Sequence, residues 1–169
     1  MFDILIKNGE IIDGTGKSRF KADLGISSGR IKKIEHSITE DAKKSINADG
    51  LVLSPGFIDI HAHTDMGICF DNKVLYKIKQ GITTDLSGNC GLSIAPIKKL
   101  SDQGSVFAGD DEKNLFVSID NFSHYLNALE KIGLGINVAS LVGHGTVRNY
   151  VVGFKEKITT SELGLMKKI

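Results

Sequence analysis

The chain has 169 residues, and its composition and charge are those of an ordinary globular protein. Hydrophobic residues make up 41% of it and charged residues 24%, which excludes collagen, a coiled coil and wholesale disorder. The formal net charge of +1 provides no general attraction to nucleic acid or to acidic membranes. No apolar stretch approaches the roughly 20 residues that span a bilayer, and the N-terminus lacks a signal-peptide pattern. We therefore expect a cytoplasmic protein with neither a membrane nor a nucleic-acid partner.

The first 55 residues predict a small antiparallel β module. Apolar residues alternate over 2–6, which is typical of a strand. Asn8-Gly9 follows, and this dipeptide before further apolar residues predicts a two-residue hairpin turn. Further turn dipeptides stand at Asp13-Gly14, Ser28-Gly29 and Asp49-Gly50. No segment of this region predicts a helix.

From residue 56 onward, apolar strands alternate with helices. Strands are predicted over 57–60, 82–87 and 136–142. Helices are predicted over 72–80, over 121–132 and from a capping box at 159–162 onward. The repeated strand–helix order is typical of parallel βα units. We therefore predict an α/β protein with domains at 1–55 and 56–169, and a polar surface excursion at 98–117.

His61 and His63 follow the first strand of the second domain. Residues i and i+2 of a strand point to the same side, so we expect the two imidazoles to project together. Neighbouring imidazoles are suited to bind a metal ion, and Asp65 lies close behind them as a further candidate. The alternative is a pair of polar residues at a point where a strand reaches the surface.

Cys90 lies 27 residues after His63, within Gly88-Asn89-Cys90-Gly91. That separation is about one βαβ unit of roughly 30 residues, so both motifs should lie at the C-terminal ends of neighbouring strands, where active sites of such folds form. A thiolate there suits zinc, although a free cysteine is more often a buried structural residue. The other cysteine, Cys69, fits that structural role.

Two further candidates follow the third predicted strand and should share the same end of the sheet. His144 lies between two glycines and is expected in a loop. Arg148 could meet a substrate carboxylate or could be an ordinary solvated side chain.

Together these motifs resemble the N-acyl-D-amino-acid deacylases (D-aminoacylases) of the amidohydrolase superfamily. The matching segments are 3–14, 55–63, 80–84, 88–96 and 137–148. The pattern P-G-F-I-D-x-H-x-H is common to the superfamily, whereas G-N-C-G-x-S-x-A-P is much narrower. The resemblance implies a small β-sandwich at 1–55, followed at 56–169 by the first three βα units of a (β/α)₈ TIM-like barrel, which would be incomplete.

The resemblance also implies a reaction and a cofactor. His61 and His63 would bind one metal ion, and Cys90 would bind the tight zinc or bridge two ions. The substrate would be a small N-acyl-D-amino acid, whose amide bond is hydrolysed by a zinc-activated water of pKa about 7. The family's further histidines and its proton-shuttling aspartate come from later strands, so we expect them beyond residue 169 and assign no catalytic acid or base.

Two alternatives stay open. One is a non-catalytic truncated fragment or half-barrel that needs a partner chain, because a (β/α)₈ barrel typically needs about 250 residues and an open sheet edge tends to associate. The other is a hydantoinase-like or dihydropyrimidinase-like cyclic amidase.

Overall fold

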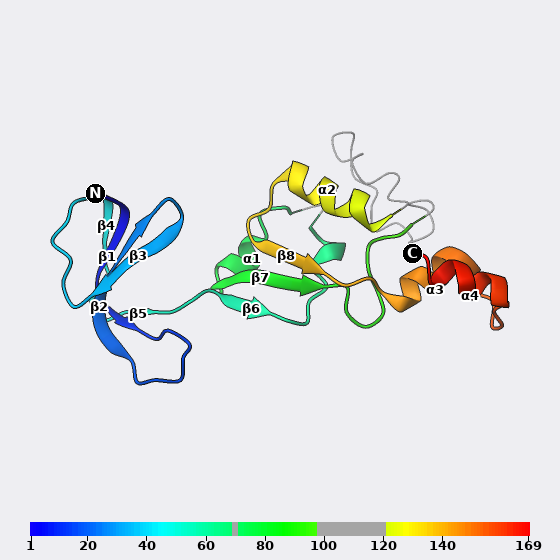
Figure 1. The fold of residues 1–169 in the computed structure, drawn as a ribbon, viewed down its shortest axis with the longest axis horizontal. Helices are drawn as coiled ribbons and strands as arrows, with labels where there is room; N and C mark the ends of the chain where they lie inside the picture. Colours follow the sequence, from blue (N-terminus) through cyan, green and yellow to red (C-terminus); the bar gives the residue numbers. More distant parts are fainter. Residues whose placement is uncertain (69–70, 98–120) are drawn as a thin grey trace. The chain divides into compact units, whose positions relative to one another are not determined.

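The structure, a computed structural model, describes residues 1–68, 71–97 and 121–169. These residues form two compact units, Met1–Pro55 and Gly56–Ile169 (Figure 1). The predictions for Cys69 and for the polar segment 98–117 lie outside the described residues. No helix in the described part of the chain is long and apolar enough to cross a membrane.

One mixed β-sheet of five strands makes up most of the first unit. Its strands are β1 (Phe2–Ile11), β2 (Phe20–Ser27), β3 (Arg30–Glu35), β4 (Ala42–Asn47) and β5 (Val52–Leu53). The pairs β1–β2 and β2–β3 are antiparallel, but β4 and β5 pair in parallel with β1. The prediction of an antiparallel module is therefore wrong for β4 and β5. After β3 the chain crosses to the far side of β1, and such a crossover produces parallel pairing. The second layer of a sandwich stays a prediction.

Asn8-Gly9 forms a bulge inside β1, so the predicted hairpin turn is wrong. The register between β1 and β2 shifts between Ile6 and Gly9, and Asn8 adopts a φ of 62°. The Asn8 backbone N–H donates to the buried Asp23 carboxylate at 2.8 Å, and the Ile38 N–H donates to the same carboxylate at 2.9 Å. Burial raises the pKa of Asp23, but these two hydrogen bonds outweigh it and lower the pKa below its usual value. A partner distant in sequence thus makes the bulge favourable.

The second unit contains a parallel sheet in the order β6–β7–β8, as the βα pattern predicted. Its strands are β6 (Phe57–Asp59), β7 (Ile82–Ser87) and β8 (Asn137–Ser140). Its helices are η1 (Thr64–Met66), α1 (Leu75–Ile78), α2 (Phe122–Ile132), α3 (His144–Val152) and α4 (Thr160–Met166). Helix α2 runs alongside β8 (Figure 1). Its apolar face packs into a core made of Ile68, Val74, Ile94, Ala95, Ile97, Tyr125, Ala128, Leu129 and Ile136.

Helix α3 was not predicted from the sequence, and His144 is its first residue rather than part of a loop. Glycine disfavours helices, so Gly143 and Gly145 favoured a loop at this position. The structure uses both glycines for close packing. An added Cβ at Gly145 would lie 2.9 Å from the Gly91 carbonyl oxygen, and one at Gly143 would lie 2.5 Å from the same atom.

Helix α4 begins with the predicted capping box. Thr159 Oγ1 accepts a hydrogen bond from the Glu162 N–H at 3.2 Å, and the Glu162 carboxylate accepts one from the Thr159 N–H at 2.8 Å. Lys155 Nζ lies 3.0 Å from the same carboxylate. The Thr159 backbone hydrogen bond, followed by those from Lys155 and the Thr159 hydroxyl, lowers the pKa of Glu162 to about 2.

We expect the contribution of Glu162 to stability to disappear in acid. The folded pKa of about 2 lies below the ordinary value of 4.5, so the folded state favours the carboxylate. The stabilisation is fully present above the unfolded pKa and is lost as the pH falls through the folded pKa. Urea unfolding of the wild type and Glu162→Gln between pH 6 and pH 2 should show a free-energy gap that shrinks with acid. A gap that stays constant over this range would contradict the assignment.

Candidate metal centre

Two histidines and a cysteine come together where β6 and β7 end. His61 Nε2 lies 3.2 Å from Cys90 Sγ, and the rings of His61 and His63 have centroids 5.8 Å apart. One ligand atom from each residue lies within 4.8 Å of the other two, and all three side chains are exposed. Within residues 1–68, 71–97 and 121–169, this is the one group of three or more such side chains with the spacing of a metal site.

The donor set and its spacing fit zinc. Imidazole nitrogen and thiolate sulfur are preferred zinc ligands, and three protein ligands leave the fourth position open, as in catalytic zinc sites. Ordinary Zn–N and Zn–S bond lengths place two ligands of one tetrahedral ion about 3.5 Å apart. The 3.2 Å separation of His61 Nε2 and Cys90 Sγ is close to that value.

Cys90 is held in an unusual backbone conformation. Its φ is 55°, between Gly88 at 80° and Gly91 at 75°. A residue with a side chain is strained in this left-handed region by roughly 1–2 kcal/mol, so tertiary contacts must impose it. The main contact is at Gly88, where an added Cβ would lie 2.0 Å from the Leu141 carbonyl oxygen. The loop between β7 and Cys90 therefore lies tightly against the end of β8.

Buried hydroxyls join the same loop to the start of α3. Ser93 Oγ accepts a hydrogen bond from the Gly143 N–H at 2.9 Å. Thr146 Oγ1 accepts one from the Ser93 N–H at 2.8 Å and lies 3.0 Å from the Ser93 carbonyl oxygen, to which it donates. These bonds explain the serine of the narrow motif, which holds the cysteine loop against the segment that follows β8.

Residues 44–165 match the model of the amidohydrolase family. The chain belongs to this family. It is 34% identical over 161 residues to D-aminoacylase of Alcaligenes xylosoxydans xylosoxydans, covering 95% of the chain and 33% of that protein. The predicted resemblance to the deacylases is therefore confirmed.

Solved structures of the same relatives also resemble this chain. A D-aminoacylase described with a binuclear metal centre superposes with a TM-score of 0.86 at 32% identity. N-acyl-D-glutamate deacylase of Bordetella bronchiseptica, complexed with zinc and a phosphonate inhibitor, superposes with a TM-score of 0.84 at 34% identity. Each match covers 99% of this chain and 35% of the solved one. The chain thus spans about a third of the length of these relatives.

A half-buried lysine that is linked through Asp59 to the candidate ligand His61 was missed by the sequence analysis. Lys77 Nζ lies 2.5 Å from Asp59 Oδ2 and 3.1 Å from Asp85 Oδ1. Asp85 is fully buried and also accepts a hydrogen bond from the Thr64 hydroxyl. Asp59 accepts one from the backbone N–H of His61 at 3.2 Å. The network therefore connects the two strand ends to the first candidate ligand, and nothing in the sequence around Lys77 indicated it.

Lys77 and Asp59 stabilise each other in their charged forms. Burial lowers the pKa of Lys77, but the hydrogen bonds that its ammonium donates to Asp59 and Asp85, with the attraction of both carboxylates, outweigh burial and raise that pKa above its usual value. The Lys77 hydrogen bond, followed by the His61 backbone N–H, lowers the pKa of Asp59. The ammonium and the Asp59 carboxylate therefore keep their charges at neutral pH.

Three other residues of this chain were candidates for the same end of the sheet. Asp65 is buried in η1, with 1% of its surface exposed. His144 begins α3. Arg148 donates to the carbonyl oxygens of Gly153, Lys155 and Glu156, and so secures the loop after α3. Within the described residues, none of these three joins the group formed by His61, His63 and Cys90.

Proposed function

We propose that this chain forms the metal-binding part of a hydrolase for N-acyl-D-amino acids, with His61, His63 and Cys90 as ligands of one or two zinc ions. The observation that carries the proposal is the convergence of their ligand atoms within 4.8 Å. The deacylase relatives support the choice of substrate, since they match 99% of the chain. Zinc bound there would supply a Lewis acid that polarises an amide carbonyl and makes water nucleophilic near neutral pH.

The chain's own residues would bind and orient the ion and leave one side open. The three ligand side chains are exposed, so a small substrate can approach from solvent. Asp59, which is paired with Lys77, accepts a hydrogen bond from the His61 backbone N–H and so holds that backbone. We assign no proton-transfer residue to the chain, because the resembled family takes it from a later strand.

The central experiment is zinc analysis of the purified chain. We expect the wild type to retain zinc after dialysis, and His61→Ala and Cys90→Ala to lose it, because each removes a ligand from a site with three. His36→Ala is the matched control, since it removes an exposed histidine from the first unit. Zinc-free wild type, or equal zinc in wild type and Cys90→Ala, would exclude the proposed site.

Substrate class needs a separate measurement. A panel of N-acyl-D-amino acids and cyclic amides, tested on the chain together with any polypeptide that completes the barrel, separates a deacylase from a cyclic amidase. Hydrolysis of the open-chain amides is expected. Preferential hydrolysis of the cyclic amides would favour the hydantoinase-like alternative.

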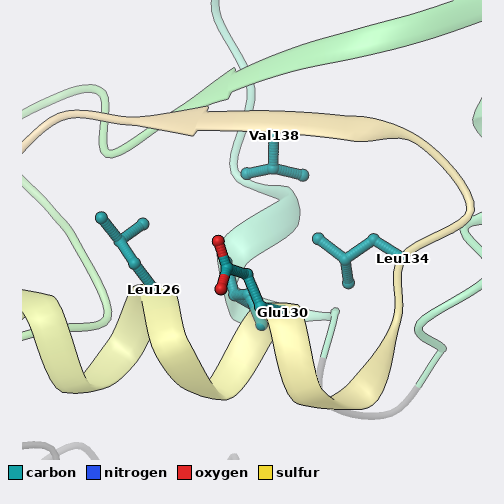
Figure 2. Close-up of a pocket in the computed structure, with 5 residues that line it drawn as sticks. Leu126, Glu130, Leu134 and Val138 are labelled. Atoms are coloured by element: carbon teal, nitrogen blue, oxygen red, sulfur yellow. The ribbon is translucent and has the colours of Figure 1, made fainter.

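A second candidate role is association with further strands, as in a half-barrel. In the edge strand β6, Ile58 is 64% exposed, and Ile60, just after it, is 71% exposed. The alternation of side chains over 57–62 predicts that helices cover this face, and within the described residues that prediction is wrong. At the other edge, a groove of about 410 Å³ lies between α2 and β8. Figure 2 shows Leu126, Leu134 and Val138 converging on it, beside Glu130. Size-exclusion chromatography tests this role, because a stable monomer that is active would exclude it.

A further inference from the structure

We infer that Asn89 is a positioning residue that sets the distance between the Cys90 thiol and the two histidines; the inference rests on the proposed zinc site. Asn89 immediately precedes Cys90, and its side chain turns back toward the histidine segment. Its amide nitrogen lies 3.2 Å from the carbonyl oxygen of Ala62, the residue between His61 and His63. The same nitrogen lies 2.7 Å from the carbonyl oxygen of Leu86 on β7.

The hydrogen bonds from the Asn89 side chain to Ala62 and Leu86, which we call the brace, belong to a closed network of hydrogen bonds. The Ala62 N–H donates to the Leu86 carbonyl at 3.1 Å, so Leu86 accepts from both the histidine segment and Asn89. A carbonyl oxygen has two lone pairs and can accept both bonds. The Asn89 carbonyl accepts from the Leu92 N–H at 2.9 Å, which closes the turn around Cys90. One side chain thus connects β7, the histidine segment and the cysteine turn.

The two hydrogen bonds of the brace require a side-chain amide of the length of asparagine. Both partners are carbonyl oxygens, so the side chain must donate twice, and the NH₂ group of asparagine provides two donors. Cys90 has a φ of 55° and does not reach its place by backbone preference alone. Without the brace, we expect the cysteine turn to relax and the thiol to move relative to His61 and His63.

Asn72 offers a matched control in the same unit. Its amide nitrogen also donates to two backbone carbonyls, those of Ile132 and Gly133, each at 3.0 Å. Both asparagines are half-buried. Asn72 bonds to the end of α2, away from the three candidate ligands. Replacing either asparagine by alanine removes two side-chain hydrogen bonds to backbone carbonyls, but only the replacement of Asn89 affects the cysteine turn.

The experiment measures zinc affinity of the full chain by competition with a chromophoric chelator, with the absorption of the cobalt-substituted protein as a second readout. Loss of a group that orients a metal ligand typically weakens metal binding about 10–100-fold. We expect that loss in Asn89→Ala, with a weaker cobalt–thiolate band, and a change of less than about twofold in Asn72→Ala. Thermal melting of the metal-free proteins should show a similar decrease in Tm for Asn89→Ala and Asn72→Ala.

Each other outcome is decisive. Wild-type affinity and an unchanged cobalt spectrum in Asn89→Ala would overturn the inference, as would an equal loss of affinity in Asn72→Ala. If circular dichroism shows Asn89→Ala to be unfolded, Asn89→Ser replaces it, because its shorter hydroxyl can donate only once; wild-type affinity in that variant also overturns the inference. A wild-type chain that binds neither zinc nor cobalt would instead refute the proposed metal site, and the inference with it.

Discussion

Lys77→Met is expected to destabilise the second unit by about 3–5 kcal/mol, the usual cost of leaving a buried charge without its partner. Lys77 is 12% exposed and Asp85 is fully buried, so the variant removes the cation beside the Asp85 carboxylate and leaves it the hydrogen bond from the Thr64 hydroxyl. Urea unfolding should show a lower midpoint with an unchanged m-value, because the surface exposed on unfolding stays the same.

Two further variants test whether the loss of stability in Lys77→Met comes from the buried charge or from the loss of any ion pair. Lys33 also bridges two carboxylates, Glu35 and Glu40, at 3.2 and 2.6 Å, but on the surface. Surface ion pairs contribute little, so Lys33→Met should change the midpoint only slightly. The double variant Lys77→Met with Asp85→Asn should recover part of the loss, because the buried charge is gone. Equal effects of Lys33→Met and Lys77→Met would contradict the buried network.

Gly88→Ala is expected to lower both the free energy of unfolding and the zinc affinity by a large amount. The new methyl group would lie 2.0 Å from the Leu141 carbonyl oxygen, and the residue has a φ of 80°. The backbone must move to relieve this contact, and Cys90 is two residues away. We expect a loss of at least about 2–3 kcal/mol, of the size seen for strained backbone positions, and zinc affinity at least about tenfold weaker.

Gly133→Ala provides the control for Gly88→Ala. Gly133 also has a positive φ, of 66°, but an added Cβ would meet no heavy atom within 4 Å. It therefore carries only the conformational cost of about 1–2 kcal/mol and should leave zinc affinity unchanged. If urea unfolding and chelator competition gave the same results for both variants, the contact with Leu141 would have no role in placing Cys90.

The sequence predicted the features that depend on local chemistry. Strand β7 was predicted with its observed bounds, and helix α2 was predicted with its observed end at Ile132 and a start one residue before Phe122. The capping box of α4 was read directly from Thr159 and Glu162. These succeeded because periodicity and capping act between residues a few positions apart. The histidine pair and Cys90 were identified for a similar reason, since their residue types and spacing carry the signal.

Other features depend on partners far away in the chain, and the sequence analysis missed them. Asn8-Gly9 has the composition of a hairpin turn, yet the Asp23 carboxylate fixes it as a bulge. Gly143 and Gly145 argued against a helix, yet they let α3 approach the cysteine loop. In each case a contact between distant segments outweighed a local preference.

By itself the sequence determined the family of this chain, its parallel βα units and the three side chains proposed to hold zinc. The tertiary structure decided how those side chains are held. Lys77 reaches Asp59 and Asp85 only because α1 lies against the strand ends, and Asn89 reaches Ala62 only because β6 and β7 are neighbours. The physical reason is that ligand identity is a property of single residues, whereas ligand position results from hydrogen bonds and close contacts that exist only after the strands have paired.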